Sequence, residues 1–212
     1  MSVYIVLLGP PGAGKGTQAE RLSKILNIPT ISTGNILRAA MRDKTPLGLA
    51  ITEAMDAGHL VSDELVIRIV EERVTKEDCA NGYILDGMPR TLPQAEELER
   101  AGFQFDAVLL MQISDEEIMH RMSGRRVCEN CGDSYHVTAV PPKVEGVCDD
   151  CGGKLVRRPD DDPETVKERL EIYHKETEPI ISFYAERGLL KPVDCKSDVD
   201  GTLQAILHAL GV

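Results

Sequence analysis

A glycine-rich segment near the start of the chain has the residue types and spacing of a phosphate-binding loop. Residues 9–17 read Gly-Pro-Pro-Gly-Ala-Gly-Lys-Gly-Thr and follow the apolar run 3–8. Glycines let successive backbone N–H groups point at one anion, because no Cβ obstructs the turn or the approach. A helix that begins near Lys15 adds its free N-terminal donors, and the lysine adds a mobile cation for the β- and γ-phosphates. The segment predicts phosphate binding, the alternative being a strand-to-helix turn without a ligand. Because Gly16 follows the lysine, the hydroxyl stands at Thr17, one position later than in the general pattern.

Four cysteines have the spacing of a metal site with thiolate ligands. Cys128 and Cys131 form one C-x-x-C pair, and Cys148 and Cys151 form a second pair after sixteen intervening residues. Two such pairs on tight turns can place four sulfurs at the corners of a tetrahedron, the geometry of structural Zn²⁺ sites. Four thiolates leave no position for water, so such a metal stabilises a small segment and does not activate a reactant. Two disulfides or an iron–sulfur cluster are the alternative structures, and a nucleic-acid-binding ribbon is the competing function.

Arginines stand on both sides of the cysteine segment. Arg121, Arg125 and Arg126 precede the first pair, and Arg157 and Arg158 follow the second. A guanidinium group can bind phosphate oxygens through two parallel hydrogen bonds, so a flap with arginines at both ends is suited to closing over a triphosphate. For any single arginine a surface salt bridge is the alternative. Their placement around one segment favours phosphate binding, most clearly for Arg125 and Arg158.

An acidic residue, Asp86, ends the apolar run 83–85. A carboxylate at such a strand end can orient Mg²⁺ through its water shell, as the second acidic motif of P-loop enzymes does. The alternative role, a helix cap, is disfavoured because Gly87 and Pro89 follow and leave no helix to cap immediately.

The elements that must position these residues alternate between strand and helix. Strands are predicted at 4–8, 30–32, 83–85, 108–113 and 190–193. Helices are predicted over 15–26, 35–41, 47–57, 63–74, 93–101, 115–122, 164–186 and 199–210. This alternation predicts an α/β fold with helices on both faces of a central, mainly parallel sheet, and ligands beyond the carboxyl ends of the strands. Residues 32–61, which are helical throughout, and 124–161, which hold the four cysteines, look like insertions into this core.

Together these motifs resemble the adenylate kinase family over nearly the whole chain, in its bacterial form with a long, zinc-bearing lid. The segments that carry the resemblance are 9–17, 32–38, 85–90 with Gln94, 124–126, the pair Asp160-Asp161 and the helix that contains Arg169. The resemblance implies a P-loop core like that of nucleoside-monophosphate kinases. This core would comprise residues 1–31, 62–123 and 162–212, with an AMP-binding insertion at 32–61 and a zinc-binding lid at 124–161.

The resemblance also implies a reaction, phosphoryl transfer from Mg²⁺-bound ATP to AMP to give two ADP, and roles for individual residues. ATP would be held by Gly12, Ala13, Gly14, Lys15, Gly16, Thr17, Arg121, Arg125, Ser134, Tyr135 and Lys196. AMP would be held by Thr33, Arg38, His59, Leu60, Val61, Gly87, Met88, Pro89, Arg90, Gln94, Arg158 and Arg169. The catalytic residues would be Lys15, Asp86, Arg90, Arg125, Arg158 and Arg169. Asn35 and Met88 depart from the aspartate and phenylalanine that are usual in relatives, which bears on fine nucleotide preference.

Composition limits the partners that we expect. The 212 residues carry a net charge of −11, which argues against a surface for nucleic acid, because a phosphate backbone needs a basic face. No apolar run approaches the roughly 20 residues that span a bilayer, and the N-terminal run lacks the basic flank of a signal peptide. We therefore expect a cytoplasmic protein without a membrane partner and, on the resemblance alone, a monomer. The alternative functions are a kinase for another nucleoside monophosphate and a P-loop switch whose zinc ribbon binds a partner.

Overall fold

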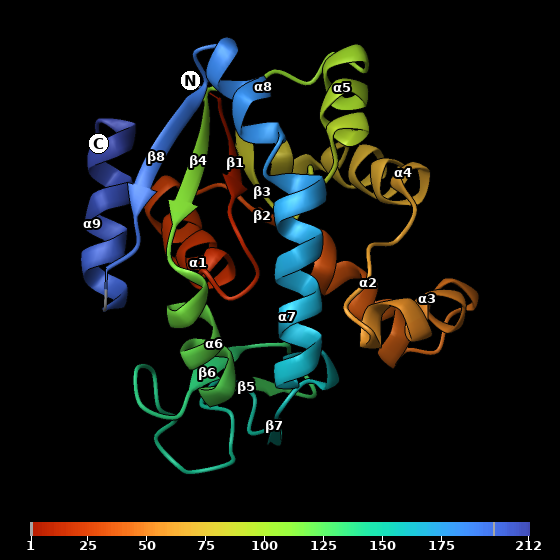
Figure 1. Ribbon diagram of the computed structural model, residues 1–212, viewed down its shortest axis with the longest axis vertical. Coiled ribbons are helices and arrows are strands. Elements are labelled where there is room, and N and C mark those ends of the chain that lie inside the picture. The colour runs from red at the N-terminus through yellow and green to blue at the C-terminus, as the bar shows by residue number, and fades with distance from the viewer. Residues whose placement is uncertain (1, 197) are drawn as a thin grey trace.

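The computed structural model describes residues 2–196 and 198–212, and a parallel β-sheet forms its centre (Figure 1). The strands are β1 (Val3–Leu8), β2 (Thr30–Ser32), β3 (Gly82–Asp86), β4 (Ala107–Gln112) and β8 (Leu190–Asp194). They lie in the order β2-β3-β1-β4-β8, and every neighbouring pair is parallel. The α/β fold with a central parallel sheet is therefore confirmed, and the glycine-rich segment leaves the carboxyl end of the central strand β1.

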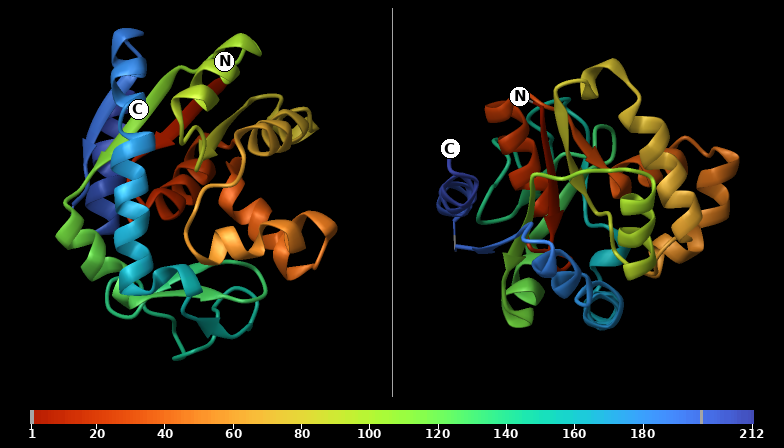
Figure 2. Two further views of the ribbon diagram at one scale, coloured as in Figure 1. Left: turned by 45° about the vertical axis from the view of Figure 1, so that its right-hand side comes forward. Right: turned by 90° about the horizontal axis from the view of Figure 1, so that it is seen from above.

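Helices bury both faces of this sheet. In β1, Ile5 and Leu7 belong to one buried cluster, and Val6 and Leu8 belong to the other, as the two-residue period of a strand requires. The first cluster packs against α1 and α9, and the second packs against α4, α5 and α8, so the sheet lies between two helical layers (Figures 1 and 2). The bounds of these helices are α1 (Lys15–Leu26), α4 (Asp63–Val74), α5 (Leu92–Arg100), α8 (Ile180–Glu186) and α9 (Val199–Leu210).

Two segments project from this core on the side of the glycine-rich loop. The first consists of α2 (Thr33–Arg42) and α3 (Pro46–Asp56). The second is an antiparallel sheet with the order β6-β5-β7, formed by β5 (Arg125–Cys128), β6 (Ser134–His136) and β7 (Leu155–Val156). The helical segment lies beside this small sheet (Figure 2), and Arg42 Nη1 donates a hydrogen bond of 2.9 Å to the carbonyl of Asn130.

Local capping signals fix the helices that lead into and out of the small sheet. α6 (Asp115–Gly124) begins after Ser114, whose hydroxyl accepts from the N–H of Glu117. The 3₁₀ turn η2 (Pro159–Asp161) and α7 (Pro163–Ile172) lead out, and Asp162 caps α7 through the N–H of Glu164. These two helices begin within one residue of the starts predicted from the sequence, 115 and 164. No helix in the described part of the chain combines the length and apolar character needed to cross a bilayer.

The continuous helix predicted over 164–186 is wrong in its middle. The structure has three segments there: α7, a π-helical turn η3 (Tyr173–Thr177), and α8. Pro179 has no N–H with which to continue the α-helical pattern, and its ring crowds the preceding turn. The N–H of Glu178 donates instead to the carbonyl of Tyr173, five residues earlier, at 2.9 Å. The chain therefore bends between α7 and α8, as Figure 1 shows.

Candidate active site and metal centre

The glycine-rich loop forms an open cradle at the start of α1. Gly14 precedes the helix with a φ of 90°, in the left-handed region that a glycine adopts without strain. No acidic side chain occupies the first turn of α1. The first N–H groups of a helix have no partner within it, and they face the positive end of the helix dipole. The loop can therefore receive an anionic group at this helix start.

Lys15 lies across the same loop. Its Nζ donates to the carbonyls of Gly9 and Pro10 at 2.6 and 2.7 Å, so the ammonium group stands over the cradle. Burial lowers the pKa of Lys15 to about 8, while Asp86 opposes the shift and Arg90 adds to it. A lysine whose charge is disfavoured by its surroundings gains stability when an anion arrives.

Asp86 stands at the carboxyl end of β3, beside the loop. Its backbone pairs in register with Leu7 of β1 and Ser32 of β2, which fixes the strand end close to the cradle. Its Oδ2 lies 3.6 Å from where a Cβ on Gly16 would stand. A carboxylate therefore faces the first turn of α1, where Thr17 supplies a hydroxyl group.

An arginine cluster lines the space between the loop, the helical segment and the small sheet. Its members are Arg38, Arg90, Arg125, Arg158 and Arg169. Asp161 pairs with Arg125, whose Nε donates to it at 2.9 Å, and Asp160 pairs with Arg169 at 2.7 Å. The five guanidinium groups and the two carboxylates, Asp160 and Asp161, together carry a net charge of +3, since five positive charges meet two negative ones. Although the chain has a net charge of −11, this part of it is positively charged.

The pKa values of the cluster are shifted first by burial and then by the neighbouring charges. Burial, together with the nearby charges of Arg38 and Arg125, lowers the pKa of Arg158 to about 9. Burial also lowers the pKa of Arg38 to about 10. Burial alone would raise the pKa of Asp160, but the arginines, Arg169 first, hold it below its usual range. Arg158 Nε is buried and has no hydrogen-bond partner among the described residues. The cluster is suited to a polyanion.

All of the residues that the sequence assigned to ATP and to catalysis lie around one cleft of about 920 Å³. The loop residues 12–17, Asp86 and the arginine cluster all line this cleft. Lys196 and Arg121 also line the cleft, and Arg121 Nη2 donates to the carbonyl of Lys196 at 2.8 Å. Ser134 and Tyr135 reach the cleft from β6.

Nine of the twelve residues assigned to AMP surround a smaller adjoining cavity of about 40 Å³. Its walls include the predicted residues Thr33, Arg38, His59, Leu60, Val61, Gly87, Arg90, Gln94 and Arg169. Pro89 and Arg158 line the larger cleft instead. Met88 lines neither space: its side chain is buried in the core cluster on one face of the sheet. Arg38, Arg90 and Arg169 line both spaces, so the cleft and the cavity meet at the arginine cluster.

Two residues near the site, His136 in the cleft wall and Asp63 beside the small cavity, were not predicted from the sequence. His136 Nδ1 accepts from the N–H groups of Thr138 and Ala139 at 3.2 and 3.1 Å, so its proton is on Nε2. Burial lowers the pKa of His136. The signal available for His136 was its position next to Tyr135, and that for Asp63 was its position in the first turn of a predicted helix.

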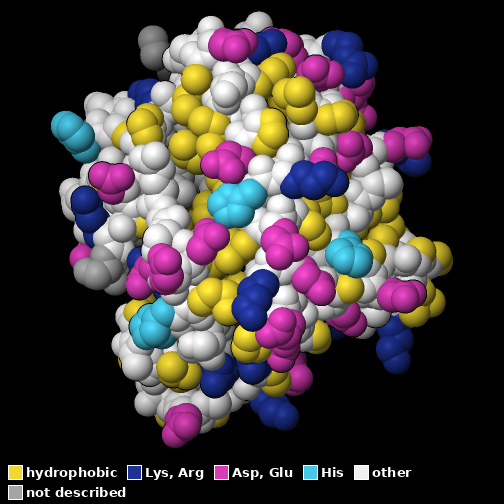
Figure 3. Space-filling view, viewed as in Figure 1, with side chains coloured by type: hydrophobic (Ala, Val, Ile, Leu, Met, Phe, Trp, Pro, Cys, Tyr) yellow, Lys and Arg dark blue, Asp and Glu magenta, His cyan; other side chains and the backbone are white. Residues whose placement is uncertain are grey.

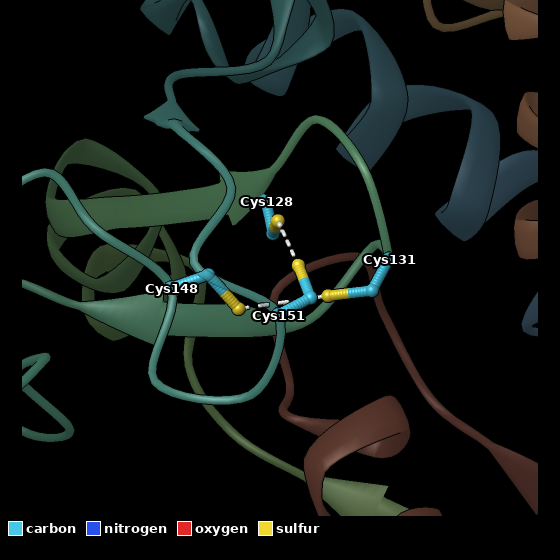
Figure 4. Close-up of side chains that lie close together, drawn as sticks. All are labelled: Cys128, Cys131, Cys148 and Cys151. Carbon is cyan, nitrogen blue, oxygen red and sulfur yellow. Dashed lines mark hydrogen bonds between the residues drawn. The ribbon is translucent and has the colours of Figure 1, made fainter.

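The four cysteines lie together on two turns of the small sheet (Figure 4). Their sulfur atoms are all within 4.8 Å of one another, with Cys128 and Cys151 at 3.4 Å and Cys131 and Cys148 at 3.6 Å. The backbone N–H of Gly132 and that of the glycine after Cys151 each close a turn onto the carbonyl of the first cysteine of a pair. The predicted four-cysteine cluster therefore forms.

The arrangement fits a tetrahedral thiolate site. Four sulfurs about 2.3 Å from a central Zn²⁺ stand roughly 3.8 Å apart, close to the separations seen here. Cys128 and Cys148 are buried and Cys131 and Cys151 are exposed. A Cβ on Gly153 would lie 2.8 Å from Cys128 Sγ, so the glycine leaves room for the sulfur. The donor set and its spacing are compatible with zinc.

Comparison with known proteins gives one consistent result. The family model described as "Adenylate kinase" matches residues 7–189. A protein named "Adenylate kinase" from Caldicellulosiruptor bescii is 53% identical over 212 residues, which cover 98% of this chain and 99% of the relative. Proteins of the same name from Ruminiclostridium cellulolyticum and Carboxydothermus hydrogenoformans are 51% identical over 212 residues and 50% identical over 210 residues. These two alignments cover 98% and 97% of this chain, and 99% and 98% of the relatives.

Proposed function

Since the chain belongs to the adenylate kinase family, we propose that its cleft and the adjoining cavity hold the two nucleotides between which it transfers a phosphoryl group. The reaction is the reversible conversion of ATP and AMP into two ADP. The observation that carries the site assignment is the arginine cluster at the junction of the two spaces. Arg38, Arg90 and Arg169 line both of them, where the phosphates of a donor and an acceptor would meet.

In this proposal the chain supplies positioning and charge, and no covalent intermediate forms on the protein. The loop N–H groups and Lys15 hold the β- and γ-phosphates, and the arginines offset the charge on the transferred group. An oxygen of the AMP phosphate forms the new P–O bond while the bond from the γ-phosphorus to the β-phosphate oxygen breaks. The attacking oxygen already carries negative charge, so no protein base has to remove a proton.

The residues beside the loop fit a magnesium ion that arrives with ATP. Asp86 offers a carboxylate and Thr17 a hydroxyl, both of the oxygen type that Mg²⁺ prefers. The ion offsets phosphate charge when it is bound. In the proposal Asp86 orients the water shell and Thr17 faces the phosphates, and the register of β3 against β1 and β2 keeps Asp86 in place.

The proposed domain organisation follows the two projecting segments. Residues 32–61 would form the AMP-binding insertion, 124–161 the lid, and 1–31, 62–123 and 162–212 the core. The hydrogen bond from Arg42 to the carbonyl of Asn130 joins the two projecting segments directly. Closure of both over the cleft would exclude water, which otherwise competes with AMP for the phosphoryl group. Lid closure is a known motion of adenylate kinases, so membership of the family implies it for this chain.

The cysteine cluster is proposed to hold Zn²⁺ for a structural purpose. The sulfurs stand at tetrahedral separations, and four thiolates leave no position for a reacting water. The small sheet offers only a small buried cluster of its own, formed by Cys128, Tyr135, Cys148 and Leu155. A metal that ties two turns together supplies the stability that so small a core lacks.

The remaining proposals concern partners and location. We expect a cytoplasmic monomer that takes neither nucleic acid nor a membrane as a partner, in keeping with its net charge of −11. On the face of the described residues seen in Figure 3, acidic and basic side chains are interspersed, and no continuous basic area is visible there. Sedimentation of the purified protein tests whether it is a monomer in solution.

The proposed acceptor is tested by an acceptor panel at fixed Mg²⁺-ATP, with AMP, GMP, CMP and UMP compared by kcat/KM. AMP is expected to be the best acceptor by at least about a hundredfold, the discrimination that a site with fixed hydrogen-bonding groups can reach. A higher kcat/KM for UMP or CMP would instead support the alternative, a kinase for another nucleoside monophosphate. ATP hydrolysis that no acceptor accelerates would support the P-loop switch.

Activity is expected to fall at alkaline pH because Lys15 loses its charge. Its pKa is lowered to about 8, so the charged form that binds phosphate dominates below that pH and is lost above it. The value of kcat/KM for ATP, which reports the free enzyme, should fall about tenfold per pH unit above pH 8. The measurement is a pH–rate profile under conditions where the protein stays folded. A profile that stays flat to pH 10 contradicts the assignment.

Replacing Arg158 by alanine is expected to separate activity from stability. Arg158 Nε has no partner among the described residues, and two neighbouring arginines lower the pKa of its guanidinium group, so its removal relieves repulsion. We expect kcat to fall about a hundredfold, as when one donor to a transition-state charge is lost. The melting temperature should stay the same or rise.

The matched control for Arg158 is the adjacent Arg157→Ala. Arg157 is exposed and donates to the carbonyl of Asp161, outside the cleft wall. Arg157→Ala should keep kcat within about threefold of wild type, as a surface substitution does. Equal losses of kcat in both variants, or a lower melting temperature for Arg158→Ala alone, would contradict the proposed role.

A further inference from the structure

Asp63 connects two helices beside the small cavity. It lies in the first turn of α4, and both oxygens of its carboxylate accept hydrogen bonds from residues at the start of α5. Oδ2 accepts from Thr91 Oγ1 at 3.0 Å, and Oδ1 accepts from Gln94 Nε2 at 2.7 Å. Thr91 and Gln94 are buried, with 8% and 2% of their surface exposed. Both carboxylate oxygens of Asp63 are thus used in hydrogen bonds at the start of α5, and one of these bonds holds the buried amide of Gln94.

The two neighbours of the Gln94 amide permit only one orientation of it. Its Oε1 accepts from the backbone N–H of Arg90 at 2.7 Å, while its Nε2 donates to Asp63. A backbone N–H can only donate, and a carboxylate can only accept. Turning the amide over would place Nε2 against the N–H and Oε1 against the carboxylate, so both hydrogen bonds would become repulsive contacts.

The orientation matters because Gln94 is part of the wall of the small cavity. A primary amide has two N–H donors and two acceptor lone pairs, so one of each remains after the bonds to Asp63 and Arg90. Adenine presents an acceptor, N1, beside a donor, the 6-amino group. Guanine presents a donor, N1–H, beside an acceptor, O6. The two bases therefore require opposite orientations of the same amide.

We infer that Asp63 is a specificity-determining positioning residue: it fixes the Gln94 amide in the orientation that reads a 6-aminopurine and rejects a 6-oxopurine. This inference rests on the proposed function, in which the small cavity takes the base of the acceptor nucleotide. Asp63 acts through Gln94 and does not touch the reacting atoms. The backbone N–H of Arg90 holds the oxygen end of the amide, and Asp63 holds the nitrogen end.

The test is the ratio of kcat/KM for AMP to kcat/KM for GMP in Asp63→Ala, at fixed Mg²⁺-ATP. Loss of one hydrogen bond at the nitrogen end should lower this ratio about tenfold. The change should arise mainly from a higher KM for AMP, with the KM for ATP within about twofold of wild type. Glu64→Ala is the matched control, because Glu64 is an exposed acid in the same helical turn and its variant loses the same charge.

Asp63→Asn is the conservative rescue variant. Its amide oxygen can accept from Gln94, and its N–H can donate to the hydroxyl of Thr91, so the AMP-to-GMP ratio should stay within about threefold of wild type. Equal losses for AMP and GMP in Asp63→Ala would overturn the inference, since a purely structural role lowers both. An unchanged ratio overturns it as well. In either case wild type still converts ATP and AMP into ADP, whereas failure of the proposed function would abolish that reaction in wild type.

A second measurement on the wild-type protein keeps the inference testable if Asp63→Ala does not fold. The side-chain amide of Gln94, observed by NMR with AMP present, should show one N–H proton shifted downfield and slow to exchange with solvent, as a bond to a carboxylate requires. Two fast-exchanging protons at the positions of a solvated amide would overturn the inference.

Discussion

Lys15→Met is expected to lower kcat about a thousandfold while leaving the fold intact, the upper end of the effect seen when one donor to transition-state charge is removed. Methionine keeps an unbranched apolar stem, one atom shorter than lysine, and removes the ammonium group with its charge and its hydrogen-bond donors. In the wild-type loop the ammonium group bonds the carbonyls of Gly9 and Pro10, and its lowered pKa, about 8, reflects burial that an arriving phosphate would compensate. Initial rates of ADP formation, with thermal unfolding in parallel, measure both effects.

Lys24→Met is the matched control for this substitution. Lys24 lies in the last turn of the same helix α1, is exposed, and pairs only loosely with Glu20 at 3.8 Å. It should keep kcat within about twofold of wild type, because exposed ion pairs contribute little. If Lys15→Met kept more than about a tenth of the wild-type kcat, the loop would not hold the transferring phosphate as proposed.

The second large effect is expected at the cysteine cluster. Cys148→Ser removes a buried thiolate and should release the metal, which we predict to be about one zinc per chain in the wild type. A loss of about 3 kcal/mol in the free energy of unfolding would lower the melting temperature by roughly 10 °C in a protein of this size. Metal analysis and thermal unfolding measure the two quantities, and a chelator added to wild type should reproduce the shift.

Cys195→Ser controls for the loss of any cysteine. Cys195 lies beside the carbonyl of Ala13 and away from the cluster, so this variant should keep its zinc and its melting temperature. Full stability of Cys148→Ser after complete metal loss would show that the cluster has no structural role. Retention of zinc by Cys148→Ser would show that the four thiolates do not act as one site.

Much of the fold could be predicted because its signals are local. In β1 every residue from Ile5 to Leu8 is buried, and an apolar run without alternation is the pattern of a strand covered on both faces. The helix starts after Ser114 and Asp162 follow from side chains that accept the first free N–H groups, and the structure has both. The two cysteine pairs could also be recognised from the sequence, because each C-x-x-C pair forms its own turn.

The parts that could not be predicted depend on contacts between distant residues. The break in the helix after Ile172 is stabilised by Thr177, whose hydroxyl donates to the carbonyl of Arg90 at 2.7 Å across 87 positions of sequence. The role of Asp63 depends on Gln94, 31 positions later, being folded against it. A sequence motif gives the type of each residue but not these pairings, so Asp63 was passed over. The break in the long helix had a local signal as well, Pro179, which the prediction of a continuous helix did not use.

The charge of the cluster could be predicted only in part. The arginines around the cysteine segment were recognised from their positions, but Arg126 and Arg157 lie outside the cleft wall whereas Arg125 and Arg158 are in it. Alternate residues of a strand face opposite sides, so the pairing of β5 with β6 and β7 decides which of Arg125 and Arg126 points into the cleft, whereas Arg157 and Arg158 lie after β7, where the chain turns into η2. The sequence analysis favoured Arg125 and Arg158 from their placement around the cysteine segment, but it did not predict the strands of the small sheet and so gave no structural reason for that choice.

The most direct test of the proposed function is the stoichiometry of the reaction, followed by ³¹P NMR of the purified protein with ATP, Mg²⁺ and AMP. We predict that two ADP appear for each ATP consumed, that the same equilibrium is reached from ADP alone, and that inorganic phosphate does not accumulate with or without AMP. Release of inorganic phosphate at a rate equal to ATP loss would contradict a closed cleft that transfers the phosphoryl group between two nucleotides.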